Sequence, residues 1–180
     1  MSPVMHSATS RTLIGLALTA LLCLGVTERA RADFNDGVLA LVSGNYETAL
    51  NTFMPLAETN DDGWSQYFLG RMYANGQGVE QDYEAAAQWY RKAAEKGLHD
   101  AQYRLGRLYA AGQGVPVDNE YAYGWYSVAA HQENPKAIEA LERARMNLSA
   151  EQIVEANKLA EQLIADFGEP LQKHPSELSE

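Results

Sequence analysis

The strongest constraint on the fold of this 180-residue chain is an internal repeat with a period of 36 residues. Residues 66–79 read QYFLGRMYANGQGV, and residues 102–115 read QYRLGRLYAAGQGV. The similarity continues along the chain, and 18 of the 29 positions from 66 to 94 are identical to their counterparts 36 residues later. A repeat of this length indicates an array of similar units, in which each unit buries its apolar side against the next.

Each unit has the pattern of two helices joined by a glycine-rich turn. In the first half, Gly70 and Tyr73 lie on one helical face, and the glycine leaves room for close packing. Gly76 and Gly78 are placed to end this helix, because glycine readily adopts the left-handed conformation of a helix C-cap. Asp82 is placed to cap a second helix. The sequence therefore predicts an all-α fold, an α-solenoid of stacked antiparallel helix hairpins.

Aromatic residues that recur after 36 residues are expected to fill the same core position in each hairpin. They are Tyr73 and Tyr109, Trp89 and Trp125, and Tyr90 and Tyr126.

Degenerate copies of the unit flank the two clear ones, and Ser149 is placed to start a final capping helix that ends near Phe167. The predicted segments are a signal peptide (1–32), a degenerate repeat (33–62), two full repeats (63–98 and 99–134), a degenerate repeat with the capping helix (135–167) and a flexible tail (168–180).

The motif shared by the two full units is Tyr-x-Leu-Gly-x-x-Tyr-x-x-Gly-x-Gly-Val-x-x-Asp, followed by Ala-x-x-Trp-Tyr-x-x-Ala-Ala. It resembles the Sel1-like repeat, a relative of the tetratricopeptide repeat with a longer loop between its helices. Residues 66–100 and 102–136 match the motif closely, and the flanks match it loosely. The resemblance implies an exported bacterial protein-interaction adaptor, of a kind often tied to signalling or envelope assembly. It does not imply a particular partner.

Residues 1–32 have the three parts of a secretory signal peptide. Arg11 precedes an apolar run at 13–26, and Ala30-Arg31-Ala32 supplies small residues at a cleavage site. The run is shorter than the roughly 20 residues that a membrane-spanning helix needs. We expect cleavage after Ala32, a periplasmic or secreted mature chain and no stable membrane insertion afterwards. An uncleaved anchor or a buried helix is the alternative.

Charge and cysteine content exclude several kinds of partner and site. The net charge of −10 repels phosphate backbones, so we expect no nucleic-acid partner. Cys23 is the single cysteine and lies inside the apolar run of the leader. The mature chain would therefore contain no disulfide, no thiol nucleophile and no multi-cysteine metal site.

No motif points to catalysis, a cofactor or a metal. The Gly-x-Gly pairs at 76–78 and 112–114 follow helix ends, where backbone carbonyls disfavour an anion. His99, His131 and His174 lack metal-ligand spacing. We expect a non-enzymatic protein with no cofactor and no bound metal.

Three arginines, Arg71, Arg107 and Arg143, also recur at 36 residues on the first helix of successive units. In related hairpin solenoids these helices line the concave surface, and Tyr67 and Tyr103 precede the first two arginines by one helical turn. The predicted partner-binding residues are Tyr67, Phe68, Arg71, Tyr103, Arg104, Arg107 and Arg143. Two interpretations stay open. The arginines pair with glutamates of a neighbouring helix, or they bind an extended peptide or an acidic segment through bidentate guanidinium contacts.

The predicted function is that of an exported protein–protein interaction scaffold or adaptor, which binds a partner protein or peptide on its concave face in envelope signalling or assembly. A cell-wall or β-lactam-acting enzyme of the same repeat family is the alternative, although the mature chain has neither the cysteines of such relatives nor a Ser-x-x-Lys motif. A carbohydrate-binding module is a third class, and it would need an exposed tryptophan such as Trp64.

Overall fold

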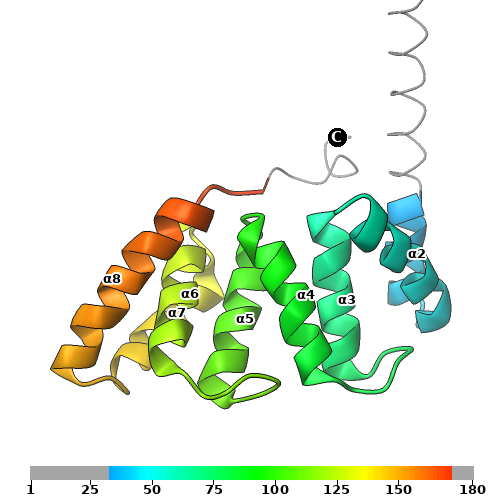
Figure 1. Cartoon of the computed structure of the whole chain (residues 1–180). Helices are drawn as coiled ribbons and strands as arrows, with labels where there is room; N and C mark the ends of the chain where they lie inside the picture. The colour runs from blue at the N-terminus through cyan, green and yellow to red at the C-terminus, as the bar shows by residue number, and fades with distance from the viewer. Residues whose placement is uncertain (1–32, 172–180) are drawn as a thin grey trace, which may run out of the picture.

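The computed structural model describes residues 33–171, and within this range the chain forms helices and turns without any strand. Residues 33–42 are helical. The helices that follow are α2 (Tyr46–Thr59), α3 (Gly63–Asn75), α4 (Tyr83–Glu95), α5 (His99–Ala111), α6 (Asn119–His131), α7 (Pro135–Arg145) and α8 (Ala150–Phe167). Figure 1 shows them following one another along a stack, from α2 at one end to α8 at the other. The predicted all-α solenoid is confirmed.

Two of the predicted segments lie wholly or partly outside the described residues. The expected signal peptide falls on residues 1–32, and most of the expected tail falls on residues 172–180. Among the helices that the structure does describe, none combines the length and the apolar character needed to cross a bilayer.

Short polar and glycine residues set the helix ends, as the sequence predicts. Asp82 and Asp118 accept hydrogen bonds from backbone amides in the first turns of α4 and α6. Gly76 and Gly112 end α3 and α5 with φ values of +65° and +64°, in the left-handed region. Because these caps act through neighbours in the chain, each 36-residue unit starts and stops its helices at equivalent positions.

The first three hairpins each close around a glycine on the first helix and an aromatic ring on the second. A Cβ atom would lie 2.8 Å from the Phe53 ring at Gly37, 2.6 Å from the Tyr90 ring at Gly70 and 2.8 Å from the Tyr126 ring at Gly106. Real Cβ contacts are longer than this. Glycine at these positions therefore allows the two helices of each hairpin to approach closely.

Buried glutamines join one hairpin to the next. Gln66 Nε2 donates to the carbonyl oxygen of Ala57 at 3.2 Å. Gln102 Nε2 donates to the carbonyl oxygens of Ala94 at 3.1 Å and Phe167 at 2.9 Å. The accepting carbonyls lie near helix C-termini, where no amide within the helix can reach them. Gln102 thus ties α5 both to the preceding helix and to the capping helix α8.

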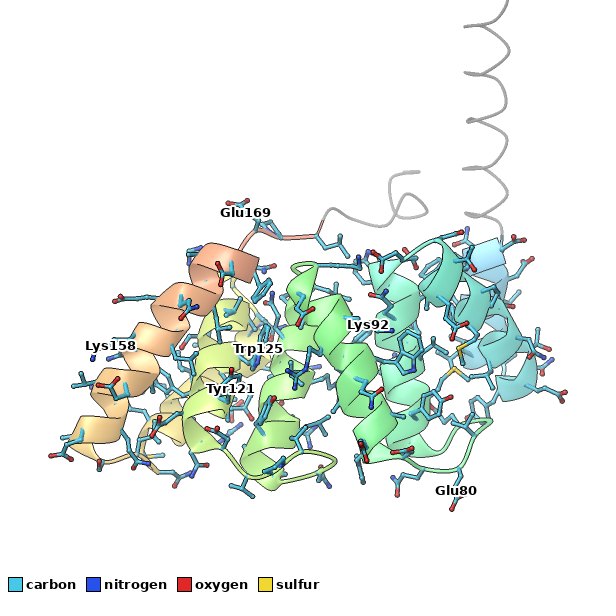
Figure 2. The ribbon with its side chains drawn as sticks, in the orientation of Figure 1. Glu80, Lys92, Tyr121, Trp125, Lys158 and Glu169 are labelled. Carbon is cyan, nitrogen blue, oxygen red and sulfur yellow. The ribbon has the colours of Figure 1, made fainter. Side chains whose placement is uncertain are left out.

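The aromatic core largely follows the prediction. Tyr90, Tyr109, Trp125 and Tyr126 are buried, and Figure 2 shows Trp125 among the side chains between the helices. Two of the six recurring aromatic residues differ, since Tyr73 and Trp89 are only half-buried. The Lys92 ammonium lies 4.2 Å from the centre of the Trp89 ring, so this ring forms a cation–π contact at the surface.

The C-terminal end of the described chain differs from the expected flexible tail. Ser149 starts α8 with a capping box and the helix ends at Phe167, as predicted. The chain then turns back to the α4–α5 turn, where the Leu171 amide donates to the Gly97 carbonyl at 3.1 Å. Residues 168–171 are held in place because Leu171 is apolar and packs against the core beside this hydrogen bond.

Candidate protein-binding face

Arg71 on α3 lies on a pair of aromatic rings. Its guanidinium carbon is 5.8 Å from the centre of the Tyr67 ring and 5.7 Å from that of Phe68, which is cation–π distance. The Arg71 Nε atom is buried and has no hydrogen-bond partner within residues 33–171. The rings therefore fix the guanidinium without neutralising its charge.

Arginines of α3 and α5 lie near enough to the buried hydroxyl of Tyr90, on α4, for their charges to act on it. Burial raises the pKa of Tyr90, while the charges of Arg104, Arg71 and Arg107 oppose that shift. Burial and then Asp100 raise the pKa of Tyr67, and Arg71 and Arg104 lower it. Three arginines from two successive repeats therefore share one neighbourhood.

The row continues to α7 through a second tyrosine. Burial, with a smaller contribution from Tyr103, raises the pKa of Tyr126 to about 12, although the charges of Arg107 and Arg143 act to lower it. Arg107 therefore acts on the hydroxyls of both Tyr90 and Tyr126. We call the four arginines Arg71, Arg104, Arg107 and Arg143, together with the two buried tyrosine hydroxyls on which their charges act, the arginine face.

The arginines differ in their ion pairs. Arg143 pairs with Glu139 of its own helix, four residues earlier. Neither Arg71 nor Arg107 forms an ion pair with any residue that the structure describes. The reason lies in the sequence, because the position four residues before the arginine is tyrosine in the first two repeats and glutamate in the third. Within the part of the chain that the structure describes, none of these three arginines pairs with a glutamate of a neighbouring helix, which was one of the two interpretations above.

Arg104 also lacks an ion pair inside the described range, although Asp100 lies one helical turn before it. The Asp100 carboxylate instead accepts a hydrogen bond from the Asn134 amide at 3.1 Å and lies 3.8 Å from the His99 ring nitrogen. Asn134 also contacts that nitrogen at 2.8 Å. This cluster stabilises the start of α7 and engages the Asp100 carboxylate in hydrogen bonding, although Asp100 remains close enough to Tyr67 to raise its pKa.

The structure places the predicted site residues in two groups. Arg107 and Arg143 are exposed, and Tyr103 and Arg104 are half-buried, so all four reach the surface. Tyr67 is only 8% exposed and packs in the core, so most of its ring is out of a partner's reach. Phe68 is half-buried and stacks on Phe53 with ring centres 5.1 Å apart. Tyr67 and Phe68 are thus mainly supports for Arg71.

Tyr90 and Tyr126 are the members of the arginine face that sequence reasoning assigned to the core alone. Their rings do fill the space left by the missing side chains of Gly70 on α3 and Gly106 on α5, which we call the glycine notches, but the charges of the arginines act on their hydroxyls. The sequence contains one sign that these tyrosines do more than pack. The N-terminal hairpin fills the same notch with Phe53, so a hydroxyl is not required for packing.

The side chains of this face have the chemistry that suits anions. Guanidinium groups form bidentate contacts with carboxylates, and tyrosine hydroxyls donate hydrogen bonds. No group of three or more His, Cys, Asp or Glu residues that could hold a metal occurs between residues 33 and 171. Trp125 is buried, and Trp64 and Trp89 are half-buried, so none of the described tryptophans is fully exposed, as a carbohydrate-binding module would require.

The Sel1 repeat family matches residues 65–98 and residues 99–134, which are the two full units of the solenoid. The chain contains two Sel1 repeats. The matched ranges contain three of the four arginines of the arginine face, while Arg143 lies on the helix that follows them. No curated protein matches the sequence.

Solved structures of other Sel1-type proteins share this fold. One is a protective antigen present in uropathogenic Escherichia coli strains that displays an SLR fold, with a TM-score of 0.73 and 31% identity over 77% of this chain and 30% of that chain. Another is a Sel1 repeat protein from Oxalobacter formigenes, with a TM-score of 0.60 and 28% identity over 72% of this chain and 55% of that chain. This Sel1-repeat chain therefore spans less than two thirds of each neighbour.

Proposed function

We propose that the protein is a non-enzymatic scaffold that binds an acidic segment of a partner protein on its arginine face. Sel1 repeats typically serve as protein-interaction scaffolds. The observation that carries the proposal is the clustering of Arg71, Arg104 and Arg107 without ion pairs inside residues 33–171, on a chain whose net charge is −10. Clustered like charges repel one another, and an acidic ligand would relieve that repulsion while selecting the partner.

The proposal is tested by removing the three arginines that recur at 36 residues. The triple variant Arg71→Ala, Arg107→Ala, Arg143→Ala should lose capture of its partner from a cell-envelope extract by at least about tenfold, because desolvated charge contacts are worth about 1.5–3 kcal/mol each. The matched control is Lys136→Ala, Arg145→Ala, Lys158→Ala, which removes the same charge from exposed positions. Circular dichroism should show unchanged helical content in both. Equal capture by both triple variants would contradict the proposal.

We further propose that the chain is exported and acts in envelope signalling or assembly. The support is the sequence of residues 1–32 together with the absence of cysteine after Ala32, which makes the mature chain indifferent to an oxidising compartment. A fusion that joins residues 1–32 to a phosphatase that is active only after export should be active. An inactive fusion that accumulates in the cytoplasm would contradict export.

A further inference from the structure

The arginine face contains a cavity of about 280 Å³ between α5, α6 and α7. Its polar lining residues are Tyr103, Arg107, Asn119, Tyr126, Arg143 and Asn147, and the remainder are alanines. Neither aspartate nor glutamate is among them. A lining with two arginines and two amides, on a chain of net charge −10, is complementary to an anion. The volume lies just below the usual range for small-molecule pockets, about 300–1,000 Å³, so it suits a side chain better than a whole cofactor.

One of the two arginines that line this cavity already pairs with a carboxylate. Glu139 occupies the position of Tyr103 in the next repeat and pairs with Arg143 across one helical turn. Both partners remain largely in solvent, with 73% of the Glu139 side chain and 56% of the Arg143 side chain exposed. An exposed pair of this kind is weak, typically about 0.3–0.5 kcal/mol, and can exchange for a better-placed carboxylate.

We propose that this cavity binds the carboxylate of an aspartate or glutamate side chain of the partner between Arg107 and Arg143, and that Glu139 competes for Arg143 in the free protein. The inference rests on the proposed function, whose acidic ligand it places at one site. A side chain is favoured over a chain terminus because the arginine face carries two further arginines, Arg104 and Arg71, beyond the cavity. A terminus supplies one carboxylate, whereas a segment with several acidic side chains supplies one to each arginine.

The test uses a fluorescent hexaglutamate peptide with an acetylated N-terminus and an amidated C-terminus, titrated with the mature protein in low salt and followed by anisotropy. Arg107→Met should weaken binding at least about tenfold, because the peptide carboxylate loses a guanidinium contact that is buried in the complex. Arg107 is exposed, so circular dichroism should show an intact fold.

The competition is tested by Glu139→Gln, which frees Arg143 and should tighten binding two- to fivefold. The matched control is Glu155→Gln on α8, which removes the same charge from a similar exposed pair with Lys158. The control should change binding less than twofold. Equal tightening by both variants would show that only net charge matters and would overturn the competition.

The outcomes separate this inference from the proposed function. If Arg71→Ala weakens binding but Arg107→Met does not, the cavity assignment is wrong and the proposed function stands. If neither variant matters, or if wild type does not bind the peptide, both are contradicted. Displacement of the blocked peptide by tetraglycine with a free C-terminus, as effective as displacement by unlabelled hexaglutamate, would identify a chain terminus as the ligand and overturn the side-chain assignment.

Discussion

Tyr90 and Tyr126 show how one residue can serve both core and surface. Their rings fill the notches left by Gly70 and Gly106, as Phe53 does at Gly37, and their hydroxyls add polarity among the arginines. Burial keeps both hydroxyls protonated to a higher pH than in an unfolded chain. The Tyr126 hydroxyl, on a residue that lines the cavity, can donate a hydrogen bond to an anion, whereas Tyr90 is almost fully covered.

The raised pKa of Tyr126 predicts a loss of stability at high pH. Its folded value of about 12 exceeds the unfolded value of 10.0, so the unfolded chain releases the proton first. The stabilisation is fully present below pH 10 and is lost as the pH rises through the folded pKa. Urea unfolding should show that Tyr126→Phe loses less stability between pH 10 and 12 than wild type. A variant with the full wild-type loss would contradict this assignment.

The close packing at Gly106 predicts that adding a side chain there lowers stability. In Gly106→Ala, the new Cβ would lie 2.8 Å from the Tyr126 ring and 3.2 Å from the Ala122 carbonyl oxygen. Urea denaturation should show destabilisation by about 1–3 kcal/mol, the range typical of overpacking. Glu142 occupies the equivalent position in the next repeat and is exposed, so Glu142→Ala should change stability by less than about 0.5 kcal/mol. Equal effects of the two variants would argue against the notch.

At the scale of helices, the parts of the fold that depend on local signals follow from the sequence. Asp82, Gly76 and Ser149 act on backbone groups within a few residues, so the ends of their helices were predictable. The hydrogen bonds of Gln66 and Gln102 could not be predicted from the sequence. These glutamines recur at the same 36-residue spacing as apolar core residues, so their spacing does not reveal which carbonyls they contact. Docking of residues 168–171 depends on Gly97, more than 70 residues earlier, and periodicity carries no information about such a contact.

Among the polar residues that join helices, Gln102 should be the one whose replacement lowers stability most. Its amide donates to the carbonyl oxygens of Ala94 and Phe167, and it is fully buried. Gln102→Ala would leave both carbonyls without this donor, and unfolding by urea should show a loss of about 1–3 kcal/mol. Gln88→Ala, at an exposed position of α4, is the control and should have little effect. A small effect of both variants would show that Gln102 does not couple the hairpins.

At the scale of the whole molecule, a chain of net negative charge carries a positively charged group of residues, the arginine face. The 36-residue spacing predicted that arginines would line successive first helices, and the structure brings them together. Spacing alone could not show that Tyr67 is covered by the adjoining hairpin. It also could not show that Tyr90 and Tyr126 reach this face from the second helices. Those facts depend on how one hairpin packs on the next.

The central claim, that a partner protein binds the arginine face, is tested most directly by site-specific photocrosslinking in cells. A benzophenone amino acid at position 147, an exposed residue that lines the cavity, should give a crosslinked partner. The same group at position 158, exposed on α8, should not. Figure 2 shows Lys158 projecting from the outer side of α8. An adduct at 147 that disappears with Arg71→Ala, Arg107→Ala, Arg143→Ala is the predicted result. Adducts from 158 alone, or equal adducts from both positions, would contradict it.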